Sequence, residues 1–296
     1  MAGAGSAARA GGDLPDLFLF VRFSILSEGD IFNQRGARYH RLAPLVPVPL
    51  RRALYRRLRP RTLEDKRAFL FDPRRLAERF ALFEAITAPS LAKQTETDFT
   101  PVVLTSTELP RDWSERLNAI AARFRLRVER IAPDRRIPEA AARIAAEARS
   151  GTVVTMRLDD DDALAAEVVA QTRAMARNVQ EPMAMVWPYG IHLRVVAGGA
   201  KQVSRFHSPW NSQGQALVEP RGAEMRTVFG LGAHTRIAEK VPTLSMPDRD
   251  SYIVASHVHN NSARFTRRRL DGRHALAFDD VPWHRFGIDA DEVRRL

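Results

Sequence analysis

Short apolar runs alternate with amphipathic stretches over roughly the first 180 residues of the chain. Residues 17–21, LFLFV, are uninterrupted apolar positions, which is typical of a strand buried on both faces of a parallel sheet. Further strands are predicted at 99–105, 126–131 and 152–158. Apolar positions recur at helical spacing in the segments between and after them, at 73–88, 113–124, 138–149 and 163–177. This alternation predicts an α/β fold with a doubly wound sheet.

The clearest helix start lies at Asp72-Pro73. Asp is a preferred N-cap residue and Pro is tolerated at the first helical position. The following apolar positions share one helical face and are expected to be buried: Leu76, Phe80, Phe83 and Ile86. We expect Pro89-Ser90 to break or kink this helix.

The pattern changes after residue 180. Residues 183–187 and 191–196 flank Pro188-Tyr189-Gly190 in the manner of a β-hairpin. Short strands are expected at 216–218, 227–229 and 252–258. We therefore expect one domain over residues 17–296, in which a mixed second half is built onto the first-half sheet. Residues 1–16 are expected to be a disordered tail, and about 28–72 a basic insertion.

Composition narrows the class of protein. The 296 residues include 45% hydrophobic ones, enough for a sizeable core, and no cysteine, which excludes disulfides and cysteine ligands or nucleophiles. No apolar run is long enough for a transmembrane helix, and the first twelve residues lack the apolar stretch of a secretory signal. The expected location is the cytoplasm, with peripheral attachment to the inner membrane face suggested by the charge.

The formal net charge is +11, and lysine occurs only at positions 66, 93, 201 and 240, so arginine carries most of it. A basic surface attracts polyanions, which leaves an arginine-rich nucleic-acid-binding protein as one alternative function. The arginines are dispersed, however, and no recognition motif interleaves them with aromatic residues. A nucleic-acid partner is therefore not expected.

Four consecutive carboxylates, Asp159 to Asp162, come after residues 153–156, VVTM, of the predicted fourth strand. Ligands of open α/β sheets bind at the carboxyl ends of the strands. Asp159 and Asp161 are two residues apart, so both can face one ion, and their hard oxygens suit Mn²⁺ or Mg²⁺. Asp162 either caps the helix expected next or reaches the metal. The simpler alternative is an acidic helix start, but four adjacent carboxylates repel one another and need a counter-charge.

Other catalytic signatures are missing from the sequence. There is no P-loop, no Gly-x-Gly-x-x-Gly, no His-Glu-x-x-His and no Gly-x-Ser-x-Gly. These absences argue against P-loop kinases, typical dehydrogenases, zincins and α/β-hydrolases. A metal-dependent nucleotidyl or phosphoryl transferase that uses the same aspartates remains a second alternative.

A strand that ends in Asp-x-Asp-Asp and is followed by Ala-Leu, as at residues 157–164, resembles the A-type (GT-A) glycosyltransferases. More narrowly, it resembles the bacterial family described as putative rhamnosyltransferases. Three further stretches carry the same resemblance: LFVRFS at 19–24, RFALFE at 79–84 with PSL, QT and DF up to residue 99, and HVHNNS at 257–262.

The resemblance implies a GT-A-like fold with a nucleotide-binding N-terminal half and an acceptor-binding C-terminal half. It implies a nucleotide-sugar donor, with dTDP-rhamnose indicated by the family description, and transfer to a saccharide or other hydroxyl acceptor. It also implies a divalent metal held by Asp159 and Asp161. A-type transferases often add a late histidine to the metal site, and His257 or His259 is the candidate here.

Several residues are candidates for binding the donor. Arg22 ends the first strand, where it could bind diphosphate bidentately, and Arg157 balances the aspartates from their own strand. Ser90 and Gln94 are expected near the same edge. Asp160 and Asn260 complete the donor-binding set, the latter as a ligand for phosphate or sugar hydroxyls.

An inverting transfer needs a general base to deprotonate the acceptor hydroxyl. Glu219, Glu224 and Asp250 all lie in the second half. We favour Glu219 as the base, because residues 217–220 look like a strand end. Asp162 is the second residue predicted to take part in catalysis.

Overall fold

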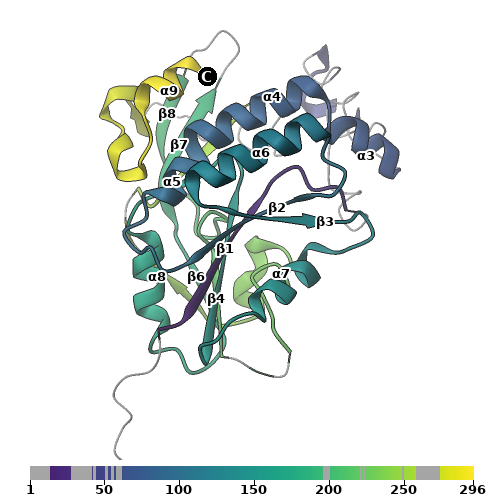
Figure 1. The fold of residues 1–296 in the computed structure, drawn as a ribbon. Coiled ribbons are helices and arrows are strands. Elements are labelled where there is room, and N and C mark those ends of the chain that lie inside the picture. The colour runs from purple at the N-terminus through teal and green to yellow at the C-terminus, as the bar shows by residue number, and fades with distance from the viewer. Residues whose placement is uncertain are drawn as a thin grey trace, which may run out of the picture.

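The computed structural model describes residues 14–27, 42, 45–50, 53–54, 57, 62–195, 201–220, 222, 224–248, 250–257 and 274–296 (Figure 1). The greater part of the expected tail at 1–16 and of the basic insertion at 28–72 falls outside these residues. So do the candidate ligands His259 and Asn260.

The larger sheet has seven strands in the order β10-β6-β9-β4-β1-β2-β3. Strands β1 to β4 are mutually parallel, whereas β9 runs antiparallel to both β4 and β6. The strands are β1 Asp16–Arg22, β2 Thr100–Ser106, β3 Arg127–Ile131, β4 Thr152–Asp159, β6 Met183–Val186, β9 Ala216–Pro220 and β10 Thr243–Ser245. The predicted α/β class with a mixed sheet is confirmed.

Helices cover both faces of this sheet, as the alternation of side chains along β1 requires. Leu17, Leu19 and Val21 belong to one core with residues of α4 Pro73–Leu82, α5 Ala88–Ala92 and α6 Arg111–Phe124. Phe18 and Phe20 belong to a second core with α7 Ile137–Ala145. The sheet is therefore doubly wound (Figure 1).

The remaining described helices lie outside the layers formed by α4 to α7. They are α3 Leu63–Leu70, α8 Val168–Ala176 and α9 Ala290–Arg295, with the 3-10 segments η3 Val48–Leu50, η5 His234–Glu239, η8 Phe278–Asp280 and η9 Trp283–Phe286. Among the described residues, no helix combines the length and the apolar composition needed to cross a membrane.

Helix α4 begins as predicted but does not end at Pro89. The Asp72 carboxylate accepts hydrogen bonds from the Arg74 and Arg75 backbone amides, and the predicted apolar stripe is fully buried. The helix continues through η4 Phe83–Thr87, a π-helical turn in which the Ala88 amide donates to the Phe83 carbonyl, into α5. The predicted break is wrong, because α5 starts at Ala88 after the wider turn and Pro89 lies in its first turn, where a proline is tolerated. The predicted kink stays a prediction.

The smaller sheet has five strands in the order β12-β8-β7-β11-β5. They are β5 Ala163–Leu164, β7 Tyr189–Val195, β8 Lys201–His207, β11 Tyr252–Ser256 and β12 Ala275–Leu276. The predicted hairpin of residues 183–187 with 191–196 is wrong, because β6 belongs to the larger sheet and β7 to the smaller one. The turn at Pro188 carries the chain from one sheet to the other, and β7 pairs with β8 and β11.

The helix predicted at 163–177 starts later than expected. Ala163 and Leu164 form β5, which pairs with Tyr252 and Ile253 of β11, and α8 begins only at Val168. Asp162 therefore does not cap a helix, and that part of the prediction was wrong. The aspartate run instead leads from the larger sheet directly into the smaller one.

Gly190 lies where the buried ring of Tyr252 packs on β7. An added Cβ would come within 2.5 Å of the Tyr252 Cε2 atom. We expect Gly190→Ala to lower the free energy of unfolding by about 1–3 kcal/mol, because an overpacked core must shift. Denaturant unfolding measures this, with Gly151→Ala as the control, because no atom lies within 4 Å of its added Cβ. Equal stability of the two variants would contradict the packing.

Candidate active site

The aspartate run begins at the point where the strand order of the larger sheet reverses. Strands β2 and β3 lie on one side of β1, and β4 lies on the other. Connections that leave in opposite directions open a crevice at the carboxyl ends of the two central strands. Arg22 and Asp159 are register partners at those ends. The two residues therefore stand where an open α/β sheet binds its ligand.

Arg22 forms a direct ion pair with Asp159. The Arg22 Nη2 atom lies 2.6 Å from Asp159 Oδ1, and Arg22 Nε donates to the same oxygen at 3.2 Å. Burial favours the neutral form of Asp159, but the charges of Arg22 and Arg157 outweigh it and hold the pKa of this carboxyl well below its usual range. Asp159 is therefore a carboxylate, and its side chain keeps 29% exposure.

Phe229 brings the two arginines of this crevice together. The guanidinium of Arg22 lies 5.9 Å from the centre of the Phe229 ring, and that of Arg157 lies 5.4 Å from it. Sequence reasoning placed Phe229 in a short strand, whereas the structure places it in a turn. Two of the predicted donor-binding residues, Arg22 and Arg157, thus share one aromatic platform beside Asp159.

Arg79 of α4 is the counter-charge of the next two aspartates, and sequence reasoning did not single it out. Its Nε atom donates to Asp160 Oδ2 at 2.8 Å, a second guanidinium nitrogen contacts Asp160 Oδ1, and Nη1 lies 3.8 Å from Asp161. Arg79 and Asp160 are both buried. One signal was available: position 79 falls within the apolar stripe of its helix, where a charge is rare unless it is paired.

His257 connects Asp161 to α4. Its Nε2 atom lies 3.0 Å from Asp161 Oδ2, and its Nδ1 atom lies 2.8 Å from Glu78 Oε1. Burial lowers the pKa of His257, but the hydrogen bonds to Asp161 and Glu78 outweigh it and raise the pKa above its ordinary value. For Asp161 the signs are reversed. Burial raises the pKa of this carboxyl, but the charge of Arg79 and the hydrogen bond from His257 outweigh burial, so the pKa lies below its ordinary value. The imidazole ring of His257 is thus held between two carboxylates, which favour its protonated form.

Asp162 turns away from these charges toward the smaller sheet. One oxygen accepts from the Ala255 backbone amide at 2.9 Å, and the other contacts the Gln213 side-chain amide. Burial, together with the negative charges of Asp161 and Asp159, raises the pKa of Asp162 well above its usual range. Asp162 therefore fastens the aspartate loop to β11 and does not face the same side as Asp159.

Ser90 and Gln94 are buried supports of the segment after the aspartates. The Ser90 hydroxyl donates to the Thr87 carbonyl. The Gln94 amide donates to the Ala165 carbonyl at 3.0 Å and accepts from the Val169 amide at 3.2 Å. These bonds position β5 and the start of α8, and the predicted direct contact of either residue with a donor does not fit this arrangement.

Glu219 lies at the opposite end of the sheet from the aspartates. In the antiparallel pair it faces Val153, six residues before Asp159, which corresponds to about 20 Å along a strand. Its carboxylate is paired with Arg226 at 2.9 and 3.0 Å. The predicted role of Glu219 as the general base at this site does not fit that position.

The structure brings together only some of the side chains that were predicted to bind a metal ion. Among the residues that the structure describes, no three His, Asp or Glu side chains are grouped so that they could hold an ion. Asp159 and Asp160 are each paired with an arginine. Asp161 Oδ2 and His257 Nε2, 3.0 Å apart, are the two predicted ligands that the structure brings together.

Comparison with known families shows which family this chain belongs to. A family model described as "Putative rhamnosyl transferase" matches residues 50–269, more than half of the chain. The chain belongs to this family. The matched segment includes the aspartate run, Arg79 and His257, whereas Arg22 lies before it. No curated protein gives a significant match.

Among solved structures, TarS residues 1–349 from S. aureus in complex with UDP-GlcNAc is 12% identical, with a TM-score of 0.38. The match covers 82% of this chain and 59% of that one, so the chain spans less than two thirds of the TarS fragment. A putative glucose-1-phosphate thymidylyltransferase from Bacillus anthracis is 10% identical over 78% of this chain and 87% of its own, with a TM-score of 0.34. These scores are too low to support an argument about the site, which rests on the family and on the geometry.

Proposed function

We propose that this protein is a glycosyltransferase that moves a sugar from a nucleotide-diphosphate donor to a hydroxyl acceptor. The family description supports this reaction and makes rhamnose the first sugar to test. The observation that carries the proposal is the position of Arg22 and Asp159, paired at the carboxyl ends of β1 and β4 where the strand order reverses.

The arginines of this crevice suit a diphosphate. The guanidinium groups of Arg22 and Arg157 lie 5.9 and 5.4 Å from the centre of the same Phe229 ring. Guanidinium groups bind phosphate oxygens with two parallel hydrogen bonds. In the transfer, the acceptor oxygen bonds to the anomeric carbon while the bond from that carbon to the diphosphate oxygen breaks. The diphosphate leaves with the electron pair, and the hydroxyl proton passes to a base. Fixed positive charges stabilise the leaving group as its charge develops.

Asp161 and His257 are the residues that would hold Mn²⁺ or Mg²⁺. Their ligating atoms, Asp161 Oδ2 and His257 Nε2, lie 3.0 Å apart, close enough for both to bind one ion. Glu78 holds the other imidazole nitrogen and fixes the direction of Nε2. A bound ion would replace the direct contact between His257 and Asp161 and would supply further positive charge for the leaving diphosphate.

A nucleic-acid-binding role gains no support. Described arginines on several elements are already paired with carboxylates, in the pairs Arg67–Glu108, Arg127–Glu147, Arg143–Glu129, Arg226–Glu219 and Arg294–Asp279. Cations that are neutralised locally contribute less to a phosphate-binding surface.

A thermal-shift panel tests the proposed donor. At a ligand concentration of 100 Kd, binding stabilises a protein by about 2.7 kcal/mol, which for a domain of this size is about 5–10 °C in Tm. We expect such a shift with a dTDP- or UDP-sugar in Mn²⁺, and a smaller one in EDTA. Nucleoside triphosphates and duplex DNA are the controls. A shift with triphosphates alone would favour a nucleotidyl transferase instead.

A further inference from the structure

Phe229 lies in a turn that is fastened to the central strand β4. The Val228 backbone amide donates a hydrogen bond to Thr155 Oγ1 of β4 at 3.0 Å, and the Gly230 amide closes the turn on the Thr227 carbonyl at 2.8 Å. Val228 is buried in a small core that it shares with residues of β6 and β9. The contacts of its neighbours therefore fix the place of Phe229 in the fold.

The Phe229 ring packs on the α7 side of the larger sheet but is only partly buried there. Its centre lies 6.0 Å from the centre of the buried Phe20 ring, at an interplanar angle of 55°. It belongs to the partly buried residues at the border of the core that α7 covers. The ring thus remains accessible to other groups, and the guanidinium groups of Arg22 and Arg157 lie over it.

These two guanidinium groups carry the same charge and belong to neighbouring strands. Arg22 ends β1 and Arg157 lies on β4, where their register partners are Asp159 and Phe20. Two like charges repel each other, whereas the face of an aromatic ring attracts a cation. A surface that holds an arginine side chain in place also lowers the conformational entropy that the side chain loses when it binds a ligand. Phe229 therefore offsets part of the repulsion and keeps both groups at the crevice.

We propose that Phe229 is a positioning residue through which the donor crevice selects a diphosphate over a monophosphate. This inference rests on the proposed glycosyltransferase function and adds the residue that sets the number of phosphates in its donor. Each guanidinium group can bind one phosphate with two parallel hydrogen bonds. A diphosphate engages both groups that Phe229 holds, whereas a monophosphate engages one of them and gains less from the arrangement.

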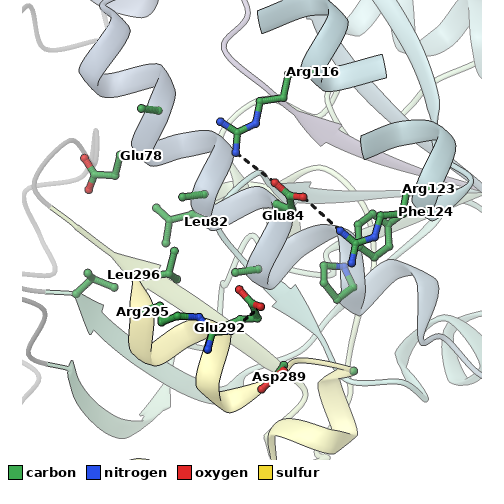
Figure 2. A pocket seen from close by; sticks show the side chains of 16 residues that line it. Glu78, Leu82, Glu84, Arg116, Arg123, Phe124, Asp289, Glu292, Arg295 and Leu296 are labelled. Atoms are coloured by element: carbon green, nitrogen blue, oxygen red, sulfur yellow. Dashed lines mark hydrogen bonds and ion pairs between the residues drawn. The ribbon is translucent and has the colours of Figure 1, made fainter. Parts of the chain in front are cut away.

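The test removes the aromatic ring and keeps an apolar side chain. Phe229→Leu and Phe229→Met retain an apolar contact with Phe20 but have no ring face for the guanidinium groups, and Phe229→Tyr keeps the ring. Phe124→Leu is the matched control. Phe124 ends α6 beside a groove of about 930 Å³ on the other side of the sheet, and the guanidinium of Arg123 lies 4.8 Å from the centre of its ring (Figure 2).

Isothermal titration calorimetry gives the Kd values of dTDP, dTMP, UDP and UMP, with inorganic pyrophosphate and phosphate as probes without a base. We expect the unmodified protein to bind the better diphosphate at least about tenfold more tightly than its monophosphate. Loss of the ring in Phe229→Leu and Phe229→Met should weaken the diphosphate about five- to tenfold, the effect of two partly exposed cation–π contacts, and the monophosphate less than about twofold. Phe229→Tyr and Phe124→Leu should leave both Kd values within about twofold.

The ratio of the two Kd values separates positioning from a general loss of structure, which would weaken both ligands alike. Equal weakening of diphosphate and monophosphate in the variants without the ring, or unchanged binding of both, would overturn the role of Phe229. So would a loss in Phe229→Tyr as large as that in Phe229→Leu, or an unmodified protein that binds both ligands equally well. Absence of binding of every nucleotide to the unmodified protein would instead refute the proposed function.

Discussion

Replacing Arg79 by methionine is expected to lower the free energy of unfolding by about 3–5 kcal/mol, because it leaves the buried carboxylate of Asp160 without its partner. The side chains of Arg79 and Asp160 are 9% and 0% exposed, so water cannot replace the lost contact. Denaturant unfolding, read from the midpoint at unchanged slope, measures the difference.

The matched control is Arg236→Met. Arg236 pairs with Glu239 at 2.6 Å, but the two side chains are 66% and 55% exposed, so the expected loss is below about 1 kcal/mol. The double variant Arg79→Met with Asp160→Leu should regain part of the stability, since no buried charge is then left unpaired at position 160. A loss at Arg79 as small as that at Arg236 would show that the cluster is not a buried ion pair.

Asp161→Asn is expected to reduce sugar transfer by about 10²–10³-fold, the cost of removing one well-placed electrostatic group from an active site. Asparagine has nearly the same shape and can still bond to His257, so the fold should survive. Steady-state donor hydrolysis and transfer, each with Mn²⁺ and with EDTA, measure the loss. The difference between the two conditions should shrink in the variant, because Asp161 is a proposed ligand of the ion.

Glu219→Gln is the companion measurement. Glu219 lies about 20 Å along the sheet from the aspartates, so we expect activity within about threefold of that of the unmodified protein. Full activity of Asp161→Asn, or an equal loss in Glu219→Gln, would contradict the assignment of the site to the carboxyl ends of β1 and β4.

The first half of the fold could be predicted because its signals are local. The apolar run of β1, the N-cap at Asp72 and the buried stripe of α4 each depend on neighbouring residues, and the structure confirms all three. Residues 163–177 misled the prediction because Ala163 and Leu164 also favour a helix. Their pairing with Tyr252 and Ile253 is set by a strand almost ninety residues away.

The site shows the same division between local and long-range information. The motif at Asp159–Asp162 located the cluster, but the different partners of the four carboxylates come from β1, α4, β11 and the turn at Gln213. Glu219 was placed at a strand end correctly. The sequence does not reveal that β9 runs antiparallel to β4. Because of this direction, Glu219 lies at the end of the sheet opposite the aspartates.

The most direct test is a crystal structure of the protein with a nucleotide-diphosphate sugar and Mn²⁺. We expect the diphosphate at the carboxyl ends of β1 and β4, within hydrogen-bonding distance of Arg22 or Arg157, and the ion on Asp161 and His257. A nucleotide bound anywhere that leaves this crevice open to water would contradict the account.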